Sequence, residues 1–231
     1  MAAAPHPALE VLRELELRDA ALGAAFDEVV RLEQGAEEVG SRAARVAALL
    51  LAAPAEHDRL AASLAAAEVA VGEAERARNA ADKTARDAEA QQRRDAAALR
   101  VDADLAADRL RGARDASARA RVALERHGAE LEATLLEAPL LERQAAGLAA
   151  GLALVVGLSK SAAGRPAAGL PGVVEWRSRA RAGLLVVRGT LSRDRDALLR
   201  EATETAAVVS PGVVAGPTVA SVRAQLEAAL G

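Results

Sequence analysis

Apolar residues recur every seven positions along the first fifty residues of the chain. One row consists of Leu15, Leu22, Val29, Ala36, Ala43 and Leu50. A second row, three positions further on, consists of Val11, Arg18, Ala25, Leu32, Val39, Val46 and Ala53. Two rows with this spacing, sustained over six heptads, are typical of a coiled coil. The pattern predicts a helix over residues 8–53, with an assembly seam of Leu15, Leu22, Val29, Leu32, Val39, Val46 and Leu50.

A second helix is predicted over residues 55–137, because proline is tolerated at a helix start and the chain has none between Pro54 and Pro139. The 3-4 spacing of apolar residues continues in its first part, from Leu60 onward. Residues 1–138 are therefore expected to form a long antiparallel coiled-coil helical hairpin, with a turn at Pro54.

The seam of this second helix is interrupted in its middle. Residues 72–98 contain no bulky apolar side chain, and the period resumes in another register, which indicates a skip of three or four residues near residues 91–94. At 1.5 Å per residue, the first helix is roughly 70 Å long and an unbroken second one roughly 125 Å. Either the polar stretch bends and the chain folds back, or the surplus length pairs with another subunit. We expect a homodimer.

The charge balance changes sign at Pro139. Residues 1–138 carry 26 acidic and 19 basic side chains, whereas residues 139–231 carry seven and eleven. Such an asymmetry indicates a domain boundary. We expect a small C-terminal helical domain over residues 139–231, with an apolar helix at about 140–160, so that the fold class is all-α.

Composition limits the chemistry. Alanine, the best helix former, supplies much of the apolar content, and the chain has one Phe, one Trp and no Cys. The three histidines do not occur at metal-ligand spacing, and no motif brings a nucleophile together with a base. The 28 arginines against two lysines indicate a GC-rich, bacterial genome. We expect no enzyme activity, no catalytic residue, no metal and no cofactor.

The apolar run of residues 145–159 admits three interpretations. The letters "GLSKS" resemble a phosphate-binding loop, but Lys160 follows Gly157 in the wrong register. A membrane contact would use Leu148, Leu152, Leu154, Val155, Val156 and Leu158. The run is shorter than the 20 or so residues of a span, so we expect the interior of a helical domain. The first ten residues lack the basic region and apolar core of a secretory signal, so we expect a cytoplasmic protein, with membrane association as the alternative.

Arginines gather in the C-terminal part of the chain. On a helix, Arg177, Arg181, Arg188 and Arg195 fall close to one face, where they could contact a polyanion such as DNA, RNA or lipid phosphates. Asp194 and Asp196 interrupt this stripe, and no aromatic residues accompany it for base stacking. We expect instead a solvated face, or one that docks on the acidic coiled coil, and therefore no nucleic-acid partner.

These observations favour a non-enzymatic coiled-coil scaffold or adaptor. It would self-associate as a homodimer and dock an unidentified protein partner through its C-terminal helical domain. A membrane-associated helical protein is the first alternative, and a nucleic-acid binder using residues 177–195 is the second.

Overall fold

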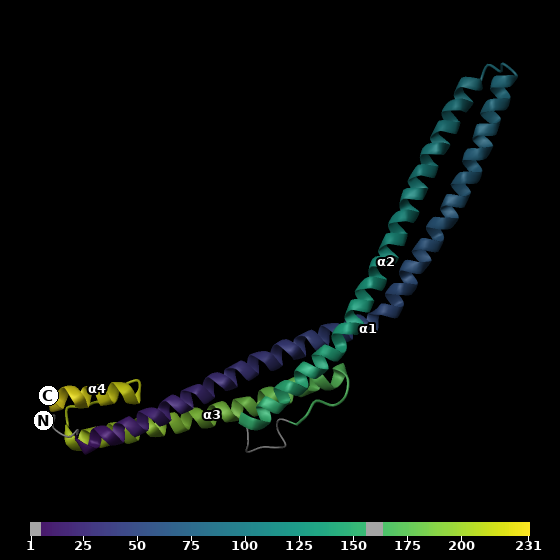
Figure 1. Ribbon diagram of the computed structural model, residues 1–231. Coiled ribbons are helices and arrows are strands. Elements are labelled where there is room, and N and C mark those ends of the chain that lie inside the picture. The colour runs from purple at the N-terminus through teal and green to yellow at the C-terminus, as the bar shows by residue number, and fades with distance from the viewer. Residues whose placement is uncertain (1–5, 156–163) are drawn as a thin grey trace. The chain divides into compact units, whose positions relative to one another are not determined.

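The computed structural model describes residues 6–155 and 164–231. These residues form four helices and no strand (Figure 1): α1 (Pro7–Ala90), α2 (Ala96–Val155), α3 (Leu170–Val209) and α4 (Val219–Leu230). The all-α prediction is confirmed for this part of the chain. The alanine content accounts for it, because alanine loses no side-chain entropy in a helix.

α1 passes through Pro54 without ending, so the predicted helix boundaries at residues 53 and 55 are wrong. A proline inside a helix removes one backbone hydrogen bond and costs about 3 kcal/mol. Here the apolar spacing continues across the proline from Ala53 to Leu60, and α2 covers this stretch. The Nε2–H of His127 donates to the carbonyl oxygen of Ala53 at 3.3 Å. Packing on both sides of Pro54 therefore outweighs one lost bond.

α2 likewise passes through Pro139 and continues to Val155. The predicted helix end at residue 137 is therefore wrong, and residues 140–155 of the apolar helix predicted at about 140–160 belong to α2 and not to a separate helix. Residues 156–160 of that prediction lie outside the described residues. Next to the proline, the Arg143 Nε donates to the Pro139 carbonyl oxygen at 3.3 Å.

The chain reverses at residues 91–95, where sequence spacing placed a skip in register. Gln92 has a φ of 50°. The Arg93 N–H donates to the Ala88 carbonyl oxygen at 2.9 Å, and the Gln92 N–H donates to that of Glu89 at 3.0 Å. These two bonds and the left-handed residue make a Schellman motif, which ends α1 although no glycine is present there. Residues 72–90 stay helical up to this turn.

The chain divides into two compact units. Residues 45–137 make the hairpin unit, and residues 1–44 with 138–231 make the terminal unit. The division expected from charge, 1–138 and 139–231, differs from this one in that residues 1–44 belong with the C-terminal part. The physical reason is that the seam over residues 8–44 is covered by α3, α4 and the last part of α2.

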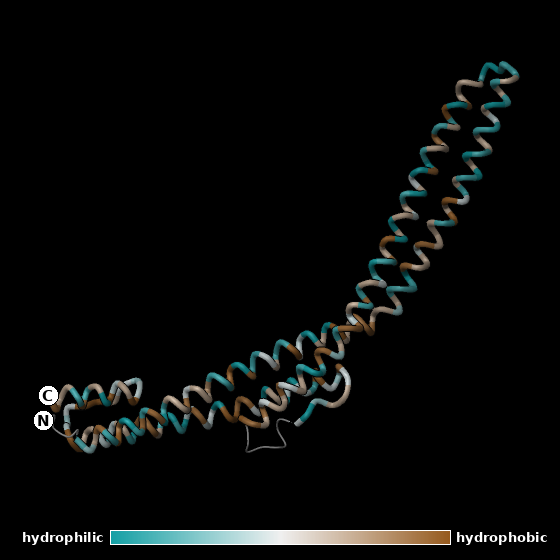
Figure 2. Tube along the Cα trace, viewed as in Figure 1, coloured by the Kyte–Doolittle hydropathy of each residue, from teal (hydrophilic) through white to brown (hydrophobic). Residues whose placement is uncertain are grey.

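The hairpin unit consists of the second part of α1 and the first part of α2, which lie side by side (Figure 1). Its buried side chains are mostly small. They are Ala53, Ala85, Ala88, Ala103, Ala106, Leu110, Ser117 and Val46. Hydrophilic residues dominate near the turn (Figure 2), as the absence of bulky residues from 72–98 predicts. Alanine faces allow two backbones to approach closely, so packing needs no thick core.

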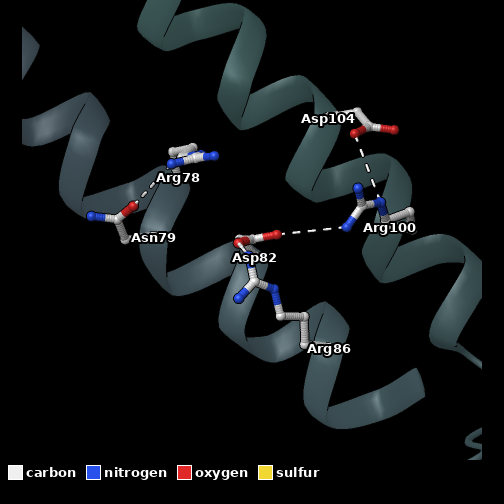
Figure 3. A network of polar contacts seen from close by, with 6 residues as sticks. All are labelled: Arg78, Asn79, Asp82, Arg86, Arg100 and Asp104. Carbon is white, nitrogen blue, oxygen red and sulfur yellow. Dashed lines mark hydrogen bonds and ion pairs between the residues drawn. The ribbon is translucent and has the colours of Figure 1, made fainter. Parts of the chain in front are cut away.

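Three interhelical ion pairs connect the two segments in antiparallel order. They are Glu68–Arg121 at 3.2 Å, Glu75–Arg114 at 2.7 Å and Asp82–Arg100 at 3.6 Å. Figure 3 shows the last of these: Arg100 lies between Asp82 of α1 and Asp104 of its own helix. Asp82 also accepts from Arg86 at 2.6 Å, so it joins two arginines. These pairs are solvent-exposed and each contributes about 1 kcal/mol or less, so they set register more than stability.

The terminal unit has a core made from both ends of the chain. Its members on α1 are Ala8, Leu12 and Leu15; those after them in sequence are Ala202, Ala206, Val213, Val219, Val222 and Leu226. Thr218 caps α4, because its side chain accepts from the Ser221 N–H. Residues 182–189 lie inside α3, although a short apolar run of this kind is by itself also compatible with a strand.

Candidate functional site

The assembly seam predicted on α1 is largely buried within one chain. Five of its residues are buried, namely Leu15, Val29, Leu32, Val39 and Val46. Leu22 and Leu50 are half-buried. In the terminal unit the seam meets α3, α4 and the last part of α2: a Cβ at Gly35 would lie 3.0 Å from Leu148, and one at Gly151 would lie 3.2 Å from Leu32. The covering surface therefore comes from this chain and requires no second copy.

The second row of the seam shifts by one position near the N-terminus. Leu12 is fully buried and Asp19 is 8% exposed, whereas Val11 is 42% exposed and the Arg18 side chain points to solvent. From Leu32 onward the row is buried as predicted. The shift follows from the partner: Asp19 can be buried because the Nε of Arg195 on α3 donates to it at 2.7 Å.

The arginine stripe of α3 docks on acidic residues of α1, which is one of the two outcomes expected from its sequence. Its ion pairs with α1 are Arg177–Glu37 at 3.5 Å, Arg188–Glu33 at 3.9 Å and Arg195–Asp19 at 2.7 Å. The Arg188 guanidinium also lies 5.2 Å from the Phe26 ring centroid, in cation–π geometry. Three of the four arginines named for polyanion contact are thus engaged inside the chain.

Arg181 is the fourth, and in the described part of the chain it has no ion-pair partner. With Arg177 it lines a groove of about 560 Å³ between α3 and α1. The opposite wall contains Glu33, Glu37 and Glu38. A polyanion entering this groove would meet these three carboxylates opposite the two arginines.

Gly40 leaves room on α1 for a side chain of α3. The side chain of Arg177 crosses it, and a Cβ at this position would lie only 2.7 Å from the Cβ and Cγ of Arg177. Arg177 also donates to the Ser41 hydroxyl oxygen at 3.1 Å. This contact joins residues 137 positions apart, so periodicity along one helix does not reveal it.

Trp176 is fully buried in α3 and is the largest side chain of this core, as a packing anchor should be. Its Nε1–H is buried with no acceptor among the described residues. A buried donor left unpaired costs about 1–3 kcal/mol. The apolar packing of α3 therefore outweighs this cost.

The residues named for membrane contact do not form one exposed face. Leu152 is fully buried, Leu148 and Val155 are half-buried, and Leu154 is 85% exposed. Val156 and Leu158 lie outside the described residues. Over the described ranges, none of the helices has the length and apolarity that crossing a bilayer requires.

Two glutamates of α1, Glu56 and Glu28, have a lowered pKa, and both belong to exposed ion pairs. The pKa of Glu56 is lowered by its hydrogen bond from Arg59, with a smaller contribution from the nearby His127. The pKa of Glu28 is lowered in the same way by Arg31. Both are pairs one turn apart on a helix surface, and they stabilise the helix locally. Within the described ranges, no three metal-ligating side chains cluster.

Comparison with known proteins adds no relative. No protein-family model matches this sequence, and no curated protein or solved structure matches it either. The assignment of a function therefore depends on the surfaces described above. Of these, the α1 seam and the α3 face that covers it bring together the largest number of predicted site residues.

Proposed function

We propose that this chain is a non-enzymatic coiled-coil scaffold or adaptor. It self-associates through the seam of α1 and docks a partner protein through its C-terminal helical part. The observation that carries this proposal is the seven-residue repeat, which runs along α1 through both rows and on past Pro54. Sustained repeats of this kind select helix–helix pairing over other packing.

The hairpin unit supplies the spacer in this proposal. Its α1 part, residues 45–90, is about 70 Å long at 1.5 Å per residue. Alanine-rich contacts and ion pairs follow its length, which supports a coiled-coil geometry. A helical pair of this length holds whatever binds at one end at a fixed distance from the other.

The reason for self-association differs from the one that the sequence offered. Because the chain reverses at residues 91–95, the two arms of the hairpin have similar lengths and leave no surplus helix. What supports a second copy is the row that begins at Val11, which follows the heptad spacing yet stays exposed at its first position. An apolar side chain in seam register that stays 42% exposed fits contact with a second copy of α1.

The two alternatives have less support. The arginines named for nucleic acid are mostly paired with α1 carboxylates, so a polyanion would have to compete with them. The apolar stretch named for membrane contact is partly buried against Leu32 and Gly35. Release of the native protein from a membrane pellet by alkaline carbonate would remove the membrane alternative.

Sedimentation equilibrium of the full chain, comparing Val11→Glu with Leu17→Glu, tests this proposal. Both residues are exposed on α1, at 42% and 67%, and both changes add one negative charge. Only Val11 lies in a seam row. A charge at a seam position must be desolvated on pairing, so Val11→Glu should weaken the dimer about tenfold or more and leave unfolding almost unchanged.

The matched variant decides the interpretation. Leu17→Glu should leave the dimer dissociation constant within about twofold of the native chain, because surface substitutions away from contacts have small effects. Equal weakening by the two variants, or a native chain that stays monomeric up to millimolar concentration, would contradict the proposal.

A further inference from the structure

One surface of α1, the seam, would contact either the chain's own helices or a second copy of α1. In the single chain, Leu15, Val29 and Leu32 are covered by the terminal unit's own helices. The proposed assembly uses the same side chains to pair with a second copy. Both occupants cannot be present together, because a fully buried leucine or valine has no accessible surface left.

We infer that α3 is an intramolecular cover of the α1 seam, and that the chain self-associates only after α3 has left α1. This inference rests on the proposed function. It makes the docked α3 an autoinhibitory element, and it makes the exposed seam of a second copy the partner that replaces α3.

The contacts that hold α3 are suited to release. The side chains of the three α1–α3 ion pairs range from 11% to 52% exposed. Water and salt reach such pairs, so their contribution is small and falls with ionic strength. The indole N–H of Trp176, which has no acceptor in the described part of the chain, regains a hydrogen bond to water when α3 leaves. Each of these features lowers the cost of opening.

The large buried side chains of α3 lie near its N-terminal end. They are Leu170, Val173, Trp176 and Leu184, and the other buried residues are Gly172, Ala180, Gly183, Ala202 and Ala206. Beyond Ala180, Leu184 is therefore the one large buried side chain of α3, and small residues bury little apolar area at about 25 cal/mol per Å². The part of α3 that includes Arg195 is held to α1 by less apolar burial than its beginning.

α1 uses one set of residues to contact α3 and α4 and a neighbouring set, one position earlier, to contact a second copy. α3 and α4 use Leu12 and Asp19, whereas the strict heptad row places Val11 and Arg18 in the seam. A seam that pairs with its own copy is isologous, so the same residues serve both chains. Asp19 leaves the seam in that register, which removes the need for Arg195.

Arg195→Glu tests the cover, because it places two negative charges together where Asp19 and Arg195 now pair. If opening becomes about tenfold more frequent, the dimer dissociation constant should fall about 100-fold, since both copies must open before they pair. The double variant Asp19→Arg/Arg195→Glu restores an opposite-charge pair and should return the constant towards the native value.

A second readout reports the position of α3 directly. The native chain has no cysteine, so spin labels can be attached at Ala24→Cys on α1 and Ser192→Cys on α3, both exposed positions. Arg195→Glu should lengthen and broaden this intramolecular distance, and the double variant should restore it. Gly40→Ala should act like Arg195→Glu, because its methyl group meets the stem of Arg177. Gly23→Ala is the matched control, because a Cβ there meets nothing within 4 Å.

Each outcome decides between hypotheses. Release of α3 with tighter association supports the cover. Release of α3 with unchanged association of a chain that does dimerise would overturn it and leave the proposed function standing. Weaker association on release would also overturn it, because α3 would then belong to the dimer interface. If neither variant moves α3, the helix is a permanent part of the core and the inference fails. If no variant or native chain associates at all, the proposed function fails with it.

Discussion

At the scale of single residues, the molecule depends on a few polar side chains placed between helices. Asp19 is nearly buried because Arg195 meets it, and His127 ties α2 to α1 beside Pro54. Most of the other ion pairs in the described part of the chain join residues three or four apart on one helix and contribute a few tenths of a kcal/mol each. The interhelical pairs therefore fix which helix lies where, and the intrahelical ones support the helices themselves.

Gln92 should be a strained position. Its φ of 50° is in the left-handed region, which costs a residue with a Cβ about 1 kcal/mol. Gln92→Gly should raise the free energy of unfolding by about 0.5–1 kcal/mol, measured by urea unfolding. The neighbouring change Gln91→Gly is the control and should lower that free energy, because glycine adds flexibility without relieving strain. A loss of stability in Gln92→Gly would contradict the turn.

The Glu56–Arg59 pair predicts a direction of pH dependence. The hydrogen bond from Arg59 lowers the pKa of Glu56 below its ordinary value of 4.5. A lowered pKa in the folded chain means that the pair stabilises the fold above that ordinary value and ceases to do so as the pH falls through the lowered pKa. In an NMR titration, Arg59→Gln should raise the pKa of Glu56 and leave that of Glu28 lowered by Arg31. An unchanged Glu56 would contradict the pairing.

At the scale of helices, the prolines predict helix ends, whereas the spacing of apolar residues predicts continuous helices. The structure follows the apolar spacing. The sequence placed a helix end at Pro54 and another at Pro139, yet both prolines lie inside helices. Proline propensity is local, whereas the seam of α1 is covered along its length by α2, α3 and α4. The break that does occur, at residues 91–95, falls where the bulky seam residues are missing and the register skips.

Pro54→Ala should stabilise the chain if α1 is continuous. The change restores a backbone hydrogen bond and removes a steric clash, which together are worth about 1–3 kcal/mol. Urea unfolding followed by circular dichroism measures the gain. Pro166→Ala, outside the helices, is the control and should change stability little or lower it slightly. No gain in Pro54→Ala would indicate that the helix does end at residue 53.

At the scale of the whole molecule, sequence spacing predicted the helical class and the seam but not what covers the seam. Val29, Leu32 and Val39 are buried as the heptads require. The covering helix, α3, is separated from them by more than 130 residues, and its recognition depends on Arg177, Arg188 and Arg195 meeting particular carboxylates. Periodicity describes one helix at a time, so it identifies an apolar face without identifying the partner.

The central claim is that the α1 seam pairs with a second copy, and one distance tests it most directly. Asp27 is exposed near the middle of the seam, so a single spin label at Asp27→Cys reports on pairing in either orientation. Packed helices lie about 8–10 Å apart, so two such labels in a dimer should be within about 30 Å of each other. We expect this short inter-copy distance to appear as concentration rises and to vanish in Val11→Glu. A dimer whose labels stay more than about 50 Å apart, or a chain with no inter-copy distance at any concentration, would contradict the account.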